Sequence, residues 1–259
     1  MKSEEVIVEI GSKNVAEITL NRPESLNTFN TRLAEQLYDA LLKLDADQKV
    51  RVVLLKGAGK AFCAGIDVNE LSGKTALQYR QWIERMERPL LAVSKMKKPV
   101  LAQCHGVAAA NGMGLVAAAD LAIAAENARM GLTAINVGLN CVGPVLPVAR
   151  SVGRKKAMEL LLYGNLISAG EALELGLINR VVPAGELEAE ARRWAEELAQ
   201  KSPIAVQIAK SAFYQVEDMT YEKQFALMNE AFARLCTSDD AKEGVRAFFE
   251  KRRPVWKEK

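Results

Sequence analysis

The chain has 259 residues, of which 49% are hydrophobic and 26% are charged, and its formal net charge is +3. This length can bury the core of one large domain with a small appendage, or of two modest domains. The composition is typical of a water-soluble globular protein and excludes the disordered, collagen-like and membrane-spanning classes. Acidic and basic residues are interleaved, so no broad nucleic-acid-binding surface is predicted.

Cysteine and histidine usage excludes several kinds of site. Cys63, Cys104, Cys141 and Cys236 form no C-x-x-C pair, which favours a reducing compartment, and we expect a cytoplasmic location. His105 is the single histidine. A metal site built on several imidazoles and a conventional Ser-His-Asp triad are therefore both disfavoured, and we predict no metal.

The first half of the sequence alternates between strand and helix patterns. A helix capped by Asn30 or Thr31 is predicted from leucines at helical spacing, and short apolar runs between helices predict buried strands. Such alternation favours parallel strands with crossover helices. The expected elements are a hairpin with strands at 6–10 and 15–20, strands at 51–56, 99–103 and 120–124, and helices from 31 to about 44, at about 77–94 and from about 112.

The second half is predicted to be mostly helical. Only 178–182 has a strand pattern, and Ser202-Pro203 fits the start of a separate helical element, since proline tolerates the first turn and serine can cap it. The helices are expected at about 155–163, 169–175, 185–200, 204–216, 221–236 and 240–252.

Two glycine-bearing loops follow buried strands. In the first, at 57–67, Ala64 and Gly65 are small enough for a ligand to approach the backbone, and Ile66 offers its N–H. In the second, at 105–114, Asn111 and Gly112 stand at the expected start of a helix, where an N–H points outward without a partner. Either loop alone is weak support for a site, because glycine-rich turns often serve only to make the turn.

Together, the loops belong to a longer series of motifs. The segments Leu20–Asn27, Ala61–Asp67, the second loop running on to Asp120, and Ile167–Ile178 resemble, in order and spacing, the signatures of the crotonase (enoyl-CoA hydratase/isomerase) superfamily. The ending at 248–254 resembles its C-terminal helix, so the likeness covers nearly the whole chain.

The resemblance implies an α/β fold, a crotonase-like spiral of repeated ββα units with a C-terminal helical region. Residues 1–200 would form the acyl-CoA-binding core, and 201–259 a helical region that builds a homotrimer or homohexamer. The expected partner is an acyl-CoA thioester in fatty acid metabolism, with no nucleic acid and no membrane span. Coenzyme A is then part of the substrate, and no separate cofactor is expected.

Carried onto this sequence, the resemblance also assigns residues. The N–H groups of Ile66 and Asn111 would form an oxyanion hole for the thioester carbonyl, and removing one such donor typically costs ~3 kcal/mol of transition-state stabilisation. Ala64 would lie beside the coenzyme. Lys251 of a neighbouring subunit would lie near its phosphates, although a solvated helix end is an equally good interpretation of this lysine.

The sequence departs from typical hydratases of the superfamily at both catalytic glutamates. Gly114 and Ala134 occupy those positions, and there is no acidic residue between Pro99 and Ala119 or between Asn127 and Met158, so we expect no neighbouring acid to substitute. The polar candidates near the thioester are Thr133, Asn136, Asn140 and Cys141, with Glu70 if its loop folds inward. Asparagine can position water but cannot accept a proton at neutral pH.

Several functions therefore remain open. The segment at 136–141 resembles a branch of enoyl-CoA hydratase-domain-containing proteins that lack both glutamates. We expect an enoyl-CoA hydratase/isomerase-like enzyme, a lyase or isomerase. The alternatives are a catalytically weak or silent acyl-CoA binder and an acyl-CoA thioesterase. A Rossmann-type enzyme is disfavoured because no G-x-G-x-x-G opens a helix.

Overall fold

The computed structural model describes residues 4–11 and 13–257 and contains two β-sheets. The larger sheet has six strands in the order β1-β2-β3-β4-β6-β9. The predicted hairpin pairs β1 with β2 antiparallel, although position 12 of its turn lies outside the described residues, and every later pairing in this sheet is parallel as predicted. Its strands are β1 (Val6–Ile10), β2 (Val15–Leu20), β3 (Val52–Gly57), β4 (Val100–Cys104), β6 (Leu121–Ala125) and β9 (Arg180–Val182).

The smaller sheet was not predicted from the sequence. It has the order β5-β7-β8, with β5 at Val107–Ala109, β7 at Arg129–Gly131 and β8 at Ile167–Ser168. β5 follows β4 and β7 follows β6, so two successive turns of the chain each add one strand to each sheet before a helix returns. Only one strand, at 178–182, was predicted after Val148. This prediction was wrong, because the described chain has two strands there, β8 and β9.

The helices largely follow the predicted pattern. Asn30 caps α1, its side chain accepting a hydrogen bond from Leu33 N. α4 begins earlier than predicted. Its first half contains a proline and ends at a kink at Gly153, where φ is +78°, so the sequence pattern does not indicate a helix there. The helices are α1 (Thr31–Ala46), α2 (Ala76–Lys95), α3 (Asn111–Ala118), α4 (Val145–Tyr163), α5 (Ala169–Glu174), α6 (Leu187–Ala199), α7 (Pro203–Val216), α8 (Tyr221–Thr237) and α9 (Asp239–Phe249).

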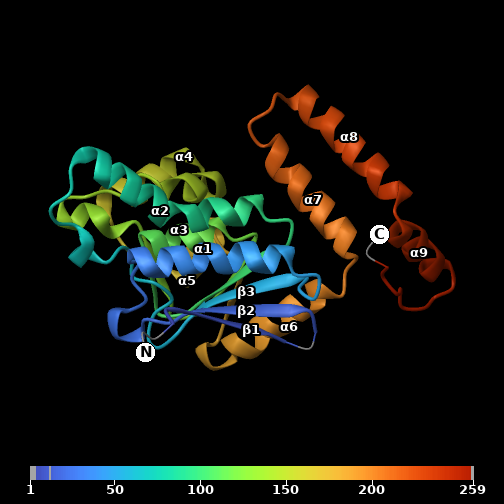
Figure 1. The fold of residues 1–259 in the computed structure, drawn as a ribbon, viewed down its shortest axis with the longest axis horizontal. Helices are drawn as coiled ribbons and strands as arrows, with labels where there is room; N and C mark the ends of the chain where they lie inside the picture. Colours follow the sequence, from blue (N-terminus) through green and yellow to red (C-terminus); the bar gives the residue numbers. More distant parts are fainter. Residues whose placement is uncertain (1–3, 12, 258–259) are drawn as a thin grey trace.

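The larger sheet carries a hydrophobic core on each face. Side chains of an extended strand alternate between faces, so Val53 and Leu55 of β3 pack with α1, whereas Val52 and Leu54 pack against α6. The two helices accordingly lie on opposite sides of the strands in Figure 1. None of the helices in the described ranges is both long and apolar enough to cross a membrane.

Helices α7 to α9 extend away from this body as an arm (Figure 1). A buried polar cluster attaches the base of the arm: Lys210 Nζ donates to Asp120 Oδ2 (2.7 Å) and to Lys98 O, and Tyr214 donates to Asp120 Oδ1. Asp120 also accepts a hydrogen bond from Val100 N, at the start of β4. The arm is thus tied to the strand that leads into the second glycine loop.

Replacing Lys210 by alanine should lower the free energy of unfolding by about 3 kcal/mol, because it leaves the buried Asp120 carboxylate without its cation. Urea denaturation measures the change. Lys242→Ala is the control, since Lys242 makes an exposed ion pair with Asp239 in the same arm and should change stability by less than about 0.5 kcal/mol. Equal effects of the two substitutions would contradict this role of the cluster.

Candidate active site

The two glycine loops meet side by side. Cys63 of the first loop makes a parallel bridge to Ala108 of β5, with Cys63 N donating to Val107 O (3.1 Å) and Ala109 N donating to Cys63 O (2.9 Å). These bonds hold the first loop along the strand that leads into α3.

Gly112 is required where the loops touch. A Cβ at this position would overlap the carbonyl oxygen of Cys63, which belongs to the backbone and cannot turn away. Gly65 is constrained for a different reason, since its φ of +108° lies in a region that favours glycine. Any larger residue at 112 would push the two loops apart.

The N–H groups of Ile66 and Asn111 are both left without a partner. On either side of Ile66 the backbone is paired with Phe29, whose N donates to Gly65 O (2.7 Å) and whose O accepts from Asp67 N (2.8 Å). Successive N–H groups of an extended chain point to opposite sides, so the Ile66 N–H faces away from Phe29. Asn111 is the first residue of α3, where intrahelical acceptors are lacking. Within residues 4–11 and 13–257, neither N–H donates a hydrogen bond.

Both residues line the same cavity, which has a volume of about 220 Å³. The wall is largely apolar, with contributions from both loops, from α2 and from the segment that precedes α4. The lining residues are Ala64, Gly65, Ile66, Val68, Leu71, Ile83, Glu87, Ala110, Asn111, Thr133, Ala134, Val137, Leu139, Asn140, Cys141, Val142, Gly143 and Pro144.

Three residues selected from the sequence lie elsewhere. Gly112 supports the loop contact rather than the wall, and the Asn136 side chain donates to Gly164 O (3.1 Å) in a structural hydrogen bond. Lys251 follows α9 at the far end of the arm, remote from α3 of the same chain (Figure 1). Ala64, Gly65, Thr133, Asn140 and Cys141 do line the cavity.

Cys141 has the properties of an inert thiol. It is only 3% exposed, and burial raises its pKa, an effect that a hydrogen bond to the Ala134 backbone only partly offsets. A thiol is nucleophilic as the thiolate, which a raised pKa disfavours. The interpretation of Cys141 as a core residue therefore fits its surroundings better than a nucleophilic role.

Two acids at the end of the first loop and just after it, Asp67 and Glu70, are structural. Burial works to raise the pKa of Asp67, but hydrogen bonds from Arg22 (2.8 Å) and Asn69 outweigh it and lower that pKa. Glu70 does not fold inward: its carboxylate accepts hydrogen bonds from Thr31 and from Trp82 Nε1 (2.9 Å). Both carboxylates brace the loop against neighbouring elements.

Glu87 is a cavity-lining acid that was not predicted from the sequence, and it comes from outside the two segments in which acidic residues are absent. It lies on α2, half-buried, in the cavity wall. Burial raises the pKa of its carboxyl. The signal was present in the sequence, because Ile83, Glu87 and Leu90 fall on one face of the helix and place an acid within an apolar stripe.

The position of the first missing glutamate is closed by packing. A Cβ on Gly114 would lie 2.8 Å from Leu90 Cδ2 and 2.9 Å from Pro144 Cβ. A side chain there would have to displace the Leu90 side chain and Pro144. Gly114 is therefore a packing position in this protein.

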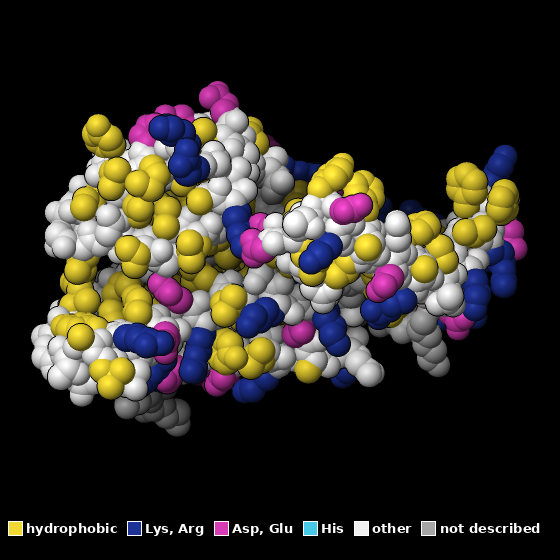
Figure 2. Space-filling view, turned by 90° about the horizontal axis from the view of Figure 1, so that it is seen from above, with side chains coloured by type: hydrophobic (Ala, Val, Ile, Leu, Met, Phe, Trp, Pro, Cys, Tyr) yellow, Lys and Arg dark blue, Asp and Glu magenta, His cyan; other side chains and the backbone are white. Residues whose placement is uncertain are grey.

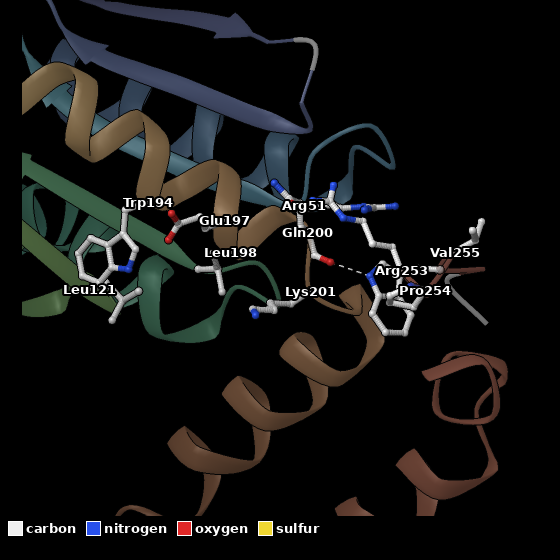
Figure 3. A pocket seen from close by; sticks show the side chains of 11 residues that line it. Arg51, Leu121, Trp194, Glu197, Leu198, Gln200, Lys201, Arg253, Pro254 and Val255 are labelled. Carbon is white, nitrogen blue, oxygen red and sulfur yellow. Dashed lines mark hydrogen bonds between the residues drawn. The ribbon is translucent and has the colours of Figure 1, made fainter. Parts of the chain in front are cut away.

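A larger cavity of about 900 Å³ lies elsewhere, between α6 and the C-terminal segment (Figure 3). Trp256 lines it and donates from Nε1 to Gln200 O (2.7 Å). Neither unpaired N–H reaches this cavity, since its wall contains neither Ile66 nor Asn111. In the described part of the chain, no group of three or more histidine, cysteine or acidic side chains could hold a metal ion.

Gly112→Ala should lower the free energy of unfolding by about 3 kcal/mol, because the new methyl group must displace the Cys63 carbonyl. Gly170→Ala is the control, since Gly170 is exposed in α5 with no close neighbour, and should leave stability equal or slightly higher. Urea denaturation of both variants tests the contact, and wild-type stability of Gly112→Ala would disprove it.

Known proteins match this chain along its length. A family model described as enoyl-CoA hydratase/isomerase matches residues 11–259. A Thermus thermophilus protein provisionally named an enoyl-CoA hydratase is 39% identical over 252 residues, which cover 96% of this chain and 99% of that protein. The mitochondrial enoyl-CoA hydratase domain-containing protein 3 of Rattus norvegicus is 32% identical, covering 93% of this chain and 81% of the relative.

Solved structures agree with the sequence relatives. The crystal structure of an enoyl-CoA hydratase from Mycobacterium smegmatis superposes with a TM-score of 0.95 at 37% identity, covering 98% of this chain and 99% of that one. The predicted fold class is thereby confirmed. Sequence, fold and the paired glycine loops all lead to the same assignment, and the chain belongs to the enoyl-CoA hydratase/isomerase family of the crotonase superfamily.

Proposed function

We propose that this protein binds an acyl-CoA thioester and polarises its carbonyl between the N–H groups of Ile66 and Asn111. The observation that carries the proposal is that both N–H groups lack a partner and both residues line one cavity. Two preorganised donors at one oxygen stabilise the negative charge that develops there when the thioester becomes an enolate. The position of Asn111 at the N-terminus of α3 adds the positive end of the helix dipole.

The other residues of the cavity wall are suited to the pantetheine chain and the acyl group of such a ligand. Ala64 and Gly65 leave room for the pantetheine chain against the backbone, and the apolar side chains of the wall favour an acyl group. Because the wall is largely apolar, each hydrogen bond to the carbonyl oxygen is stronger than it would be in water. The coenzyme serves as the carrier of the acyl group, and the proposal requires no separate cofactor.

The reaction that we propose is of hydratase/isomerase type, either addition of water to an enoyl-CoA or movement of its double bond. Both reactions pass through the enolate that the two N–H groups stabilise. Membership of the family supports this class of chemistry over thioester hydrolysis. A silent binder would need the oxyanion hole but no group that can transfer a proton, and the cavity does contain a carboxyl.

The arm supports a proposal about assembly, namely that this chain forms homotrimers or homohexamers. Its helices carry large hydrophobic side chains in contact with solvent, visible in yellow along the extended part of Figure 2. Many exposed large hydrophobic side chains on one region normally mark a contact with another chain. The exposed side chains are Phe213, Met219, Tyr221, Phe225, Phe232, Val245, Phe248 and Phe249. In an oligomer, Lys251 of a neighbouring subunit would be available to the coenzyme's phosphates. A cytoplasmic location stays a prediction from the cysteine pattern.

Binding of an acyl-CoA and of its carbonyl-free analogue tests the proposed contact. Butyryl-CoA should bind at least about tenfold more tightly than S-butyl-CoA, because the thioether lacks the oxygen that accepts two hydrogen bonds. Isothermal titration calorimetry measures both dissociation constants. A carbon-13 label at the carbonyl should also show a lower stretching frequency when the thioester is bound.

Free coenzyme A is the control, since it presents the same phosphates and pantetheine without an acyl group. Equal affinity for thioester and thioether, with an unshifted carbonyl frequency, would contradict the oxyanion hole. Failure of both ligands to bind would contradict the acyl-CoA class altogether.

A further inference from the structure

We propose that Glu87 is the proton-transferring residue of this site, an inference that rests on the proposed acyl-CoA function. Its carboxyl enters the cavity from α2, and neither of the loop positions where hydratases of the superfamily carry glutamates supplies an acid here. Within the described cavity wall Glu87 is the one carboxyl side chain.

The close packing of α2 on its neighbours sets the position of the carboxyl. Leu90 packs on Gly114 of α3, and Glu87 lies one turn earlier on the same face of the helix. There its carboxyl occupies the space above Gly143, where a Cβ would overlap both carboxyl oxygens. The absence of a side chain at 143 thus leaves room for the Glu87 carboxyl.

A second contact places this carboxyl near the proposed oxyanion hole. The buried Asn111 side chain reaches Met86 O of α2 at 3.5 Å, the residue directly before Glu87. Asn111 therefore offers its main-chain N–H to the cavity while its side chain touches the helix that carries the carboxyl. The proton donor and one amide donor lie on adjoining parts of one wall.

The carboxyl of Glu87 is also chemically available. Among the residues that the structure describes, no hydrogen bond or ion pair engages it, in contrast to Asp67 and Glu70, whose partners hold them ionised. Burial raises the pKa of Glu87, which brings its titration closer to neutral pH. A group that must both accept and release a proton works best when its pKa is near the working pH.

The proposed step balances with water as the only co-reactant. The Glu87 carboxylate takes a proton from a water molecule as the water oxygen forms its bond to C3 of the enoyl-CoA. The C2=C3 electron pair moves toward the carbonyl, and the resulting enolate oxygen accepts hydrogen bonds from the Ile66 and Asn111 N–H groups. The enolate then takes the proton from Glu87 onto C2, which regenerates the carboxylate with no change of oxidation state.

Glu87→Gln tests the role with little change in shape. The full chain is assayed for hydration of crotonyl-CoA and longer enoyl-CoA thioesters, and for exchange of the C2 protons of butyryl-CoA in D₂O by NMR. We expect Glu87→Gln to lose about 100-fold or more of both rates while its dissociation constant for butyryl-CoA stays within about threefold. Glu84→Gln is the matched control on the same helix, since Glu84 is exposed and pairs with Arg80, and should retain the wild-type rates.

Gly143→Ala provides a second test in which the carboxyl remains present. The added methyl group displaces the Glu87 carboxyl, which is the flexible end of its side chain. We expect Gly143→Ala to reduce both rates at least about tenfold, and to have no further effect when it is combined with Glu87→Gln. Melting temperatures of all variants confirm that each is folded.

The outcomes separate this inference from the proposed function. Wild-type rates in Glu87→Gln overturn the role of Glu87 and leave acyl-CoA binding intact. A wild-type protein that binds butyryl-CoA but shows neither hydration nor exchange overturns it as well. A wild-type protein that binds neither butyryl-CoA nor crotonyl-CoA overturns the proposed function, and the role of Glu87 with it.

Discussion

The contact between Cys63 and the strand leading into α3 is the constraint on which the site depends. Main-chain hydrogen bonds and close contacts at glycines bring together loops that lie more than forty residues apart in the sequence. The loops in turn present Ile66 and Asn111 to one cavity. Because main-chain atoms make both the contact and the proposed donors, side chains around them can vary while the geometry is kept. The loop geometry therefore does not depend on glutamates at positions 114 and 134.

Close helix packing accounts for the position of Glu87, the residue that we propose in their place. Gly114 lets α2 approach α3 until Leu90 fills the space that a glutamate would need. The same approach carries Glu87 into the cavity, since Leu90 and Glu87 share a face of α2. The close contact at Gly114 and the entry of the Glu87 carboxyl into the cavity are thus features of one packing arrangement. The sequences of the two loops by themselves show only that the glutamates are absent.

Sequence patterns predicted the parts of the molecule with strong periodicity. Strands such as β3 and helices such as α1 were located within one or two residues, because long apolar patterns and a capping asparagine mark them. The smaller sheet escaped because strands of two or three residues, such as Ile167–Ser168, are too short to show a period. The loops were found through their family likeness, whereas Glu87 was missed because a charged residue on a helix is usually solvated. Its location within an apolar stripe became meaningful only once α2 was seen to border the cavity.

The surrounding carboxylates further distinguish Glu87. Arg22 holds Asp67, and the side chains of Thr31 and Trp82 hold Glu70, so hydrogen bonding outweighs burial and lowers the pKa of both acids. No hydrogen bond offsets the burial of Glu87, and its pKa is raised. Acids that stabilise a fold need a fixed charge, whereas an acid that transfers protons must change its charge during each cycle. Asp67 and Glu70 are thus held by partners outside the cavity wall, whereas Glu87, which lines the cavity, has the environment that the proposed proton transfer requires.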